Sequence, residues 1–123
     1  MCLTRDGCRT HFHELGLSYD DVDEGDIAAL QLMLNATVKR CRKNPTGSYH
    51  SRWRMGKKPK VRMRGDCISE AYLFICVNHP YWRECVSFNS DGFIGFCGEF
   101  DDKNAAPILE TFCKWCDMMA GSR

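Results

Sequence analysis

The chain has 123 residues, and its 17 basic and 16 acidic side chains leave a net charge of only +1. So small a charge gives no overall attraction to nucleic acid or to a membrane surface. No apolar run approaches the roughly 18 residues of a membrane span, and the first residues lack the apolar core of a signal peptide. We therefore expect a cytoplasmic protein without membrane contact. The length and the lack of a linker predict a single domain over residues 1–123.

Helical spacing marks the first half of the chain. Residues 1–19 show no sustained period and are predicted to form an irregular N-terminal arm with one helical turn near residues 12–17. From Asp23, a good N-cap residue, apolar residues recur every three or four positions until Asn44 and Pro45 end the pattern. The resulting apolar stripe consists of Ile27, Leu30, Leu34, Val38 and Cys41.

Strand patterns follow. Apolar and basic residues alternate over residues 60–64, residues 71–77 are apolar on both faces, and alternation returns over residues 82–88. A hairpin turn at residues 89–92 leads to a fourth strand at residues 93–97.

A helix is predicted next, from Asn104 to Met119, with Pro107 in its first turn and with Ile108, Phe112, Trp115 and Met119 as its apolar stripe. The predicted fold class is α+β: an N-terminal helix, a four-stranded antiparallel β-meander and a C-terminal helix. Two helices cover only one face of such a sheet. The apolar second face therefore requires the N-terminal arm or another subunit, and we favour a homo-oligomer.

A basic stretch is the most informative feature of the sequence. Residues 39–64 contain eleven of the 17 basic side chains and no acidic residue. Its two ends have an ordinary explanation as well: cations suit the last turn of a helix, and basic residues protect an edge strand. The middle of the stretch has the composition of an anion site, with guanidinium groups, an exposed glycine backbone and lysines. Its residues are Arg52, Arg54, Gly56, Lys57 and Lys58.

The hairpin supplies further candidate ligand contacts. Its flanking aromatic residues, such as Phe88, are expected mostly in the core, and turn chemistry explains most of Asn89 and Asp91. The alternative is that Asn89 or Asp91 hydrogen-bonds a base or a ribose while Phe88 stacks on the base.

Three other groupings carry less weight. Cys2, Cys8, His11 and His13 have looser spacing than zinc sites, so no metal is expected there. Cys113 and Cys116 have the spacing of a redox motif but lie within a helix near the end of the chain, which disfavours that chemistry. An odd number of nine cysteines favours reduced thiols. No nucleophile is paired with a base, so we expect no enzyme and no cofactor.

The chain resembles the phage-encoded anti-Thoeris sponge proteins of the first type. Residues 67–119 carry the resemblance: an apolar strand, the segment 88–96, and an acidic entry at residues 101–104 into a helix with Phe112 and Trp115. The resemblance implies sequestration of a cyclic ADP-ribose-type signal without cleavage, in the host cytoplasm, by an oligomer with pockets between subunits. In some members a second site holds cyclic oligonucleotides. The family's clamp of arginines on the last helix is matched here only by Lys103 and Lys114.

Our leading hypothesis is therefore a non-catalytic protein that binds and sequesters a small phosphorylated ligand, a cyclic nucleotide. Arg54, Lys57 and Lys58 would neutralise phosphate and Gly56 would donate a backbone N–H, with Lys103 as an additional cation. Two alternatives remain. One is a single-stranded nucleic-acid-binding module that uses the same cations, and the other is a protein inhibitor of a host factor.

Overall fold

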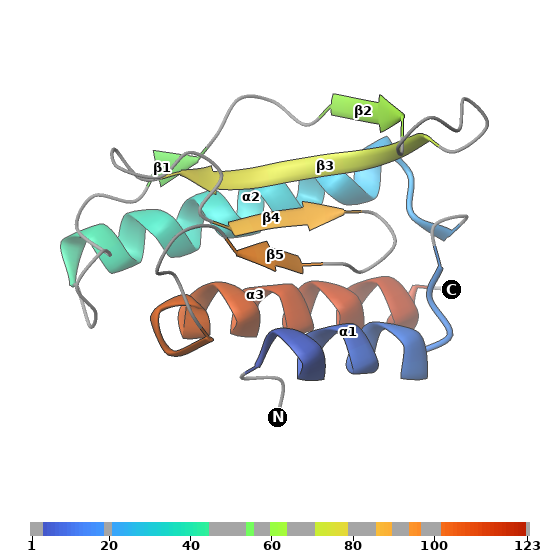
Figure 1. Ribbon diagram of the computed structural model, residues 1–123, viewed down its shortest axis with the longest axis horizontal. Helices are drawn as coiled ribbons and strands as arrows, with labels where there is room; N and C mark the ends of the chain where they lie inside the picture. Colours follow the sequence, from blue (N-terminus) through green and yellow to red (C-terminus); the bar gives the residue numbers. More distant parts are fainter. Residues whose placement is uncertain are drawn as a thin grey trace.

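The computed structural model describes residues 4–18, 21–44, 54–55, 60–63, 71–78, 86–89, 94–96 and 102–122 (Figure 1). The helices are α1 (Arg5–Glu14), α2 (Glu24–Lys43) and α3 (Asp102–Gly121). The strands are β1 (Arg54–Met55), β2 (Lys60–Met63), β3 (Ala71–Asn78), β4 (Val86–Asn89) and β5 (Ile94–Phe96).

The predicted α+β fold with a four-stranded meander is wrong. Three helices hold most of the residues whose side chains the structure describes, and β1, outside the four predicted strands, adds a fifth strand to the consecutive pairs β2–β3, β3–β4 and β4–β5. β1 and β2 both pair antiparallel with one edge of β3, β4 pairs with its other edge, and β5 pairs with β4. The physical reason is the length of β3, whose eight residues leave room for two short strands side by side on one edge.

The irregular arm predicted for residues 1–19 is also wrong, because Arg5–Glu14 is a helix. The Thr4 hydroxyl caps it by accepting a hydrogen bond from the Gly7 N–H at 2.9 Å. Cys8 and Phe12, one turn apart, are its buried residues. Two apolar positions are too few to reveal a helical period in the sequence.

The helix predicted from Asp23 is confirmed as α2. Asp23 and Asp26 form a capping box, in which each carboxylate accepts the backbone N–H of the other residue, at 2.8 and 3.2 Å. Asn44 follows the last turn. The predicted stripe is buried from Ile27 to Cys41.

The predicted C-terminal helix is confirmed as α3, with two extra residues at each end. Pro107 therefore lies in the second turn, not in the first as predicted. Its ring removes one backbone hydrogen bond, which the helix tolerates because the rest of the turn is packed. Among the described residues, no helix is both long enough and apolar enough to cross a bilayer.

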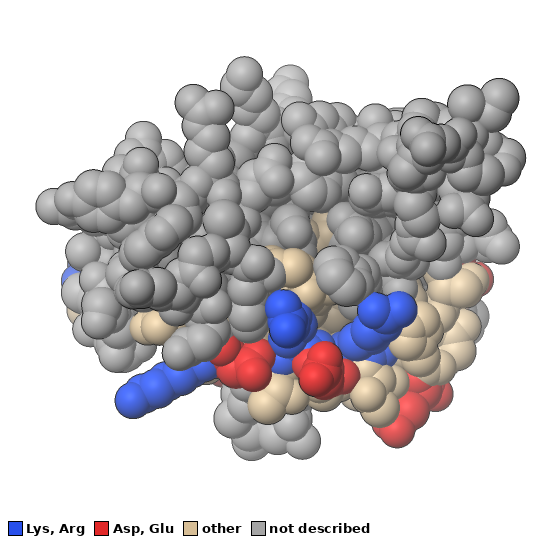
Figure 2. All heavy atoms as spheres, in the orientation of Figure 1, with Lys and Arg blue, Asp and Glu red and all other residues tan. Residues whose placement is uncertain are grey.

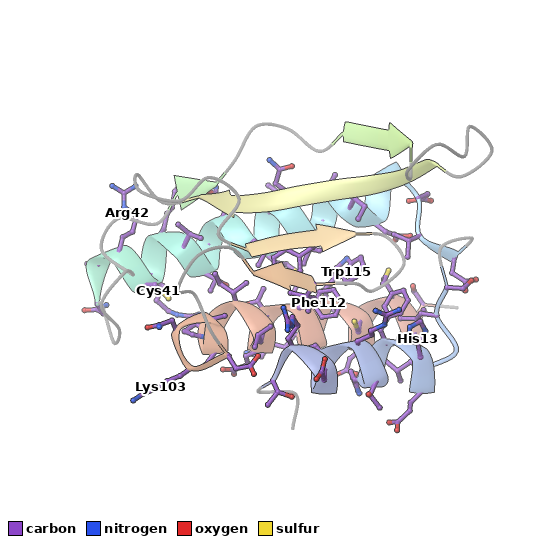
Figure 3. All side chains as sticks on the ribbon, viewed as in Figure 1. His13, Cys41, Arg42, Lys103, Phe112 and Trp115 are labelled. Carbon is purple, nitrogen blue, oxygen red and sulfur yellow. The ribbon has the colours of Figure 1, made fainter. Side chains whose placement is uncertain are left out.

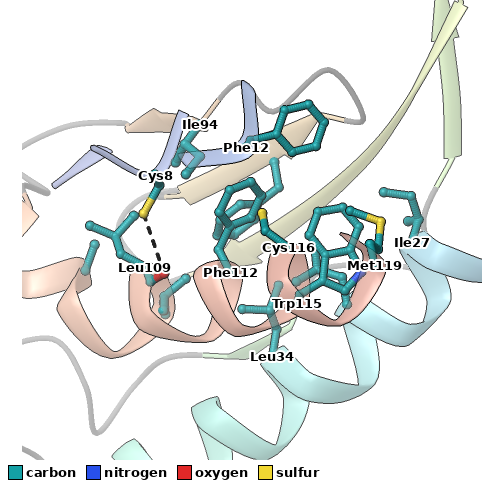
Figure 4. Close-up of a cluster of buried hydrophobic side chains, with 14 of the residues drawn as sticks. Cys8, Phe12, Ile27, Leu34, Ile94, Leu109, Phe112, Trp115, Cys116 and Met119 are labelled. Carbon is teal, nitrogen blue, oxygen red and sulfur yellow. Dashed lines mark hydrogen bonds between the residues drawn. The ribbon is translucent and has the colours of Figure 1, made fainter. Parts of the chain in front are cut away.

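The core lies where α1 and α2 pack on α3 beneath the sheet (Figure 4). The rings of Phe12, Phe88 and Trp115 surround that of Phe112, with centroids 6.4, 5.6 and 5.5 Å from it. Phe88 and Ile94, from β4 and β5, join the same buried cluster. Burial of a large apolar side chain contributes about 1.5–3 kcal/mol, so this cluster dominates the stability of the fold.

Buried polar groups in the helical layer are paired. The Trp115 indole N–H donates to the Asp26 carbonyl at 2.9 Å, and the hydroxyls of Thr37 and Thr111 lie 2.6 Å apart. These contacts join the start and the second half of α2 to α3 in reverse order, so the two helices run antiparallel. The end of α2 is thereby held at a defined place beside the sheet.

Candidate anion-binding site

The last two turns of α2 carry a dense group of cations. Helical spacing turns Val38 and Cys41 into the core, so the residues between and after them face solvent. We call these four exposed residues the α2 basic cluster: Lys39, Arg40, Arg42 and Lys43. They form the first part of the acid-free stretch recognised in the sequence.

Within the described part of the chain, no ion pair or hydrogen bond engages a side chain of the α2 basic cluster. On α3, by contrast, Lys114 Nζ lies 3.4 Å from Glu110 Oε1. The negative end of the helix dipole stabilises each cation of the cluster by about 0.3–1 kcal/mol, which explains why cations are tolerated at the end of α2. A dipole does not occupy an N–H donor, however, so it does not satisfy the hydrogen-bonding groups of these side chains.

The thiol of Cys41 lies inward from this cluster (Figure 3). Burial raises the pKa of the Cys41 thiol above its ordinary value, and the neighbouring Arg40 charge opposes this only in part. The thiol therefore stays neutral at physiological pH and places no negative charge beneath the cations.

The fold places Arg54, from the middle of the basic stretch, near the α2 basic cluster. β1 packs against α2, and its Arg54 pairs with Asn78 at the end of β3. In Figure 3, Arg42 lies at the end of α2 next to β1. The backbone of Arg54 is thus placed beside the α2 basic cluster, although these residues are more than ten positions apart in the chain.

The backbone of β2 places further basic residues along the edge of the sheet. Lys60 pairs with Phe74 and Arg62 pairs with Tyr72, on the edge of β3 that β1 also occupies. Arg54 and Lys60 are therefore separated by four residues of β3, about 13 Å. Asn89 pairs with Phe74 on the other edge of β3. The backbones of Asn89 and Lys60 therefore lie on either side of Phe74, across the sheet, about 10 Å apart.

Of the other predicted site residues, the structure describes Phe88 and Lys103, and neither side chain lies with the α2 basic cluster. Phe88 is fully buried and stacks on Phe112, so its ring belongs to the core. Lys103 is exposed on the first turn of α3, at the same end of the molecule as Arg42, but the two side chains point away from each other (Figure 3). Arg52, Gly56, Lys57, Lys58 and Asp91 lie outside the described residues.

The described members of the N-terminal cysteine and histidine group do not converge. Cys8 is buried against α3, His11 Nε2 lies 2.6 Å from Asp117 Oδ1, and His13 is exposed beside Phe12. No group of three His, Cys, Asp or Glu side chains in the described ranges is arranged to hold a metal ion. Cys2 lies outside those ranges.

The surface formed by α1 and α3 has a different charge pattern. Figure 2 shows Lys and Arg side chains beside Asp and Glu side chains where α1 and the start of α3 lie. Mixed charges of this kind largely offset one another. Charge segregation thus distinguishes the end of α2 and the β1–β2 edge from the α1–α3 surface.

No protein family, curated protein or solved structure matches the chain. The resemblance to the anti-Thoeris sponge proteins therefore rests on the residues named above alone.

Proposed function

We propose that the protein binds and sequesters a small phosphorylated ligand of the cyclic-nucleotide class, without cleaving it. The observation that carries the proposal is the segregated charge at the end of α2: four exposed cations with no described partner, beside the backbone of Arg54. A phosphate bound there would receive charge-assisted hydrogen bonds, which contribute roughly 1.5–3 kcal/mol each.

The roles of individual residues follow from their chemistry. Arg54, Lys57 and Lys58 neutralise phosphate together with the α2 basic cluster, while Gly56 donates its backbone N–H. Asn89, across β3 from Lys60, hydrogen-bonds the base or ribose. The ring of Phe88 is buried in the core, so it is not available to stack on a base. We assign the stacking instead to Trp53, which lies between Arg52 and Arg54 in the sequence.

The sponge-family resemblance supports the rest of the proposal. It supports a location in the cytoplasm, in that of a host cell if a phage encodes the chain, and a homo-oligomer with pockets between its subunits. The apolar stretch 71–77 supports association of subunits, because contiguous apolar surface is typical of interfaces.

Thermal unfolding with a panel of ligands tests the proposal. The panel contains cyclic ADP-ribose, cyclic di- and trinucleotides, and adenosine as a control without phosphate. Ligand at a hundred times its Kd stabilises the folded state by about 2.7 kcal/mol, which raises Tm by roughly 10 °C for a chain of this size. The bound nucleotide should be recovered chemically unchanged after heat release. A panel without any shift, or recovery of a cleaved product, would overturn the proposal.

The same assay separates the alternative of a nucleic-acid-binding module. Single-stranded oligonucleotides should bind only weakly if the site is built for a small ligand. A larger shift with oligonucleotides than with any cyclic nucleotide, lost steeply as salt rises, would instead favour the nucleic-acid function.

A further inference from the structure

Two helices from opposite ends of the chain are joined along one seam. The Arg5 N–H donates to Asp102 Oδ1 at 2.6 Å, and His11 Nε2 lies 2.6 Å from Asp117 Oδ1. Both pairs follow the same order along α1 and α3, so the two helices run parallel, as Figure 1 shows. We call this contact the α1–α3 seam.

Two thiols meet in the middle of the seam. Cys8 Sγ lies 3.3 Å from Cys113 Sγ and 3.6 Å from the Leu109 carbonyl oxygen, toward which it points (Figure 4). Cys8 is fully buried, whereas Cys113 is partly exposed. One residue of the pair is thus partly exposed to solvent, and the sulfur of the second lies in direct contact with the sulfur of the first.

We propose that Cys8 and Cys113 are a redox-sensitive pair that a peroxide converts to a disulfide, clamping α1 onto α3. The Cys113 thiolate attacks one peroxide oxygen, which gives a sulfenic acid and releases water. The Cys8 sulfur then attacks the sulfenic sulfur; the S–S bond forms, the S–O bond breaks, and the hydroxide leaves as water with the Cys8 proton. Two thiols lose two electrons in all, and one peroxide is reduced to two waters.

The geometry selects this pair over the neighbouring Cys113 and Cys116. Side chains three residues apart on a helix have Cβ atoms about 5–6 Å apart, whereas a disulfide needs about 3.5–4.5 Å. Cys116 is also fully buried. The Arg5–Asp102 and His11–Asp117 contacts on either side hold α1 in register, so the Cys8 and Cys113 sulfurs meet without rearrangement of the helices.

The clamp should stabilise the fold measurably. Cys8 and Cys113 are 105 positions apart, so a bond between them closes a loop over most of the chain. Loops of that length lose the most conformational entropy in the unfolded state, and we expect Tm to rise by on the order of 10 °C.

Peptide mapping tests the connectivity directly. Trypsin cuts after Lys and Arg and places the three cysteines in separate peptides: Cys8 in residues 6–9, Cys113 in residues 104–114 and Cys116 in residues 115–123. After mild hydrogen peroxide treatment, we expect the peptide 6–9 linked to 104–114, a link that a reductant removes. Linkage of 104–114 to 115–123 or to any other peptide, or no linkage, would overturn the proposal.

Two matched variants give an independent measurement. Cys113→Ser should lose the peroxide-dependent rise in Tm, whereas Cys116→Ser, one turn further along α3, should keep it. Oxidation of methionine affects both variants alike, so the difference between them reports the disulfide. An equal rise in the two variants would contradict the assignment. Neither experiment requires a nucleotide, so its outcome is independent of the proposed function.

Discussion

The helical core and the α2 basic cluster differ in how their polar groups are satisfied. In the core, the Trp115 N–H has the Asp26 carbonyl, the hydroxyls of Thr37 and Thr111 share a hydrogen bond, and four aromatic rings pack together. The α2 basic cluster has cations without a described partner. Stability and binding are therefore assigned to different residues of the same helices, and substitutions should separate them.

The largest expected effect is on the core. Phe112→Ala removes a fully buried ring that contacts three others and should lower the free energy of unfolding by roughly 3–5 kcal/mol, because the cavity cannot refill. Urea denaturation monitored by circular dichroism measures the loss. Phe112→Leu, which retains most of the volume, should cost clearly less. A loss below about 1 kcal/mol for the alanine variant would show that the ring does not organise the core.

A smaller effect is expected where α2 crosses α3. Thr111→Val removes a hydroxyl that lies 2.6 Å from that of Thr37 and 3.0 Å from the Pro107 carbonyl oxygen, at a cost of about 1–2 kcal/mol. The Thr37 hydroxyl lies 3.0 Å from the Met33 carbonyl oxygen, and since each hydroxyl has one proton, one of the two donates to its carbonyl and the other donates across the helix pair. Thr37→Val and Thr111→Val combined should therefore cost less than the sum of the two. Additive losses in the double-mutant cycle would mean that the hydroxyls do not interact.

The smallest effect on stability is expected at the α2 basic cluster. Arg42→Gln combined with Lys43→Gln removes two exposed charges and should change the free energy of unfolding by less than about 1 kcal/mol, since only the helix dipole favours them. Arg9→Gln with Lys114→Gln removes the same charge from α1 and α3 and serves as the control. Marked destabilisation of the α2 variant alone would assign the cluster a structural role instead.

The predictable parts of the fold are those with dense local signals. The extent of α2 follows from five stripe residues and the capping pair Asp23 and Asp26, and α3 has an equally regular stripe. The buried residues of α1 are only Cys8 and Phe12, so its sequence shows no helical period of apolar residues. The pairing of β1 with β3 depends on contacts between distant segments, which local patterns cannot show.

The candidate site follows the same division. The charge of the α2 basic cluster is visible in the sequence, but its place beside Arg54 is a consequence of how α2 packs on β1. The meeting of Cys8 with Cys113 was not predictable either, because the two lie near opposite ends of the chain. Sequence spacing drew attention instead to Cys116, which is buried.

One binding measurement tests most directly whether the α2 basic cluster holds an anion. Isothermal titration with cyclic ADP-ribose and a cyclic trinucleotide would compare the wild type, the Arg42→Gln/Lys43→Gln variant and the Arg9→Gln/Lys114→Gln control. If each lost cation removes one charge-assisted contact, affinity should fall roughly tenfold per residue in the first variant and stay unchanged in the control. Equal affinity of all three proteins, or binding by none of them, would contradict the proposed site.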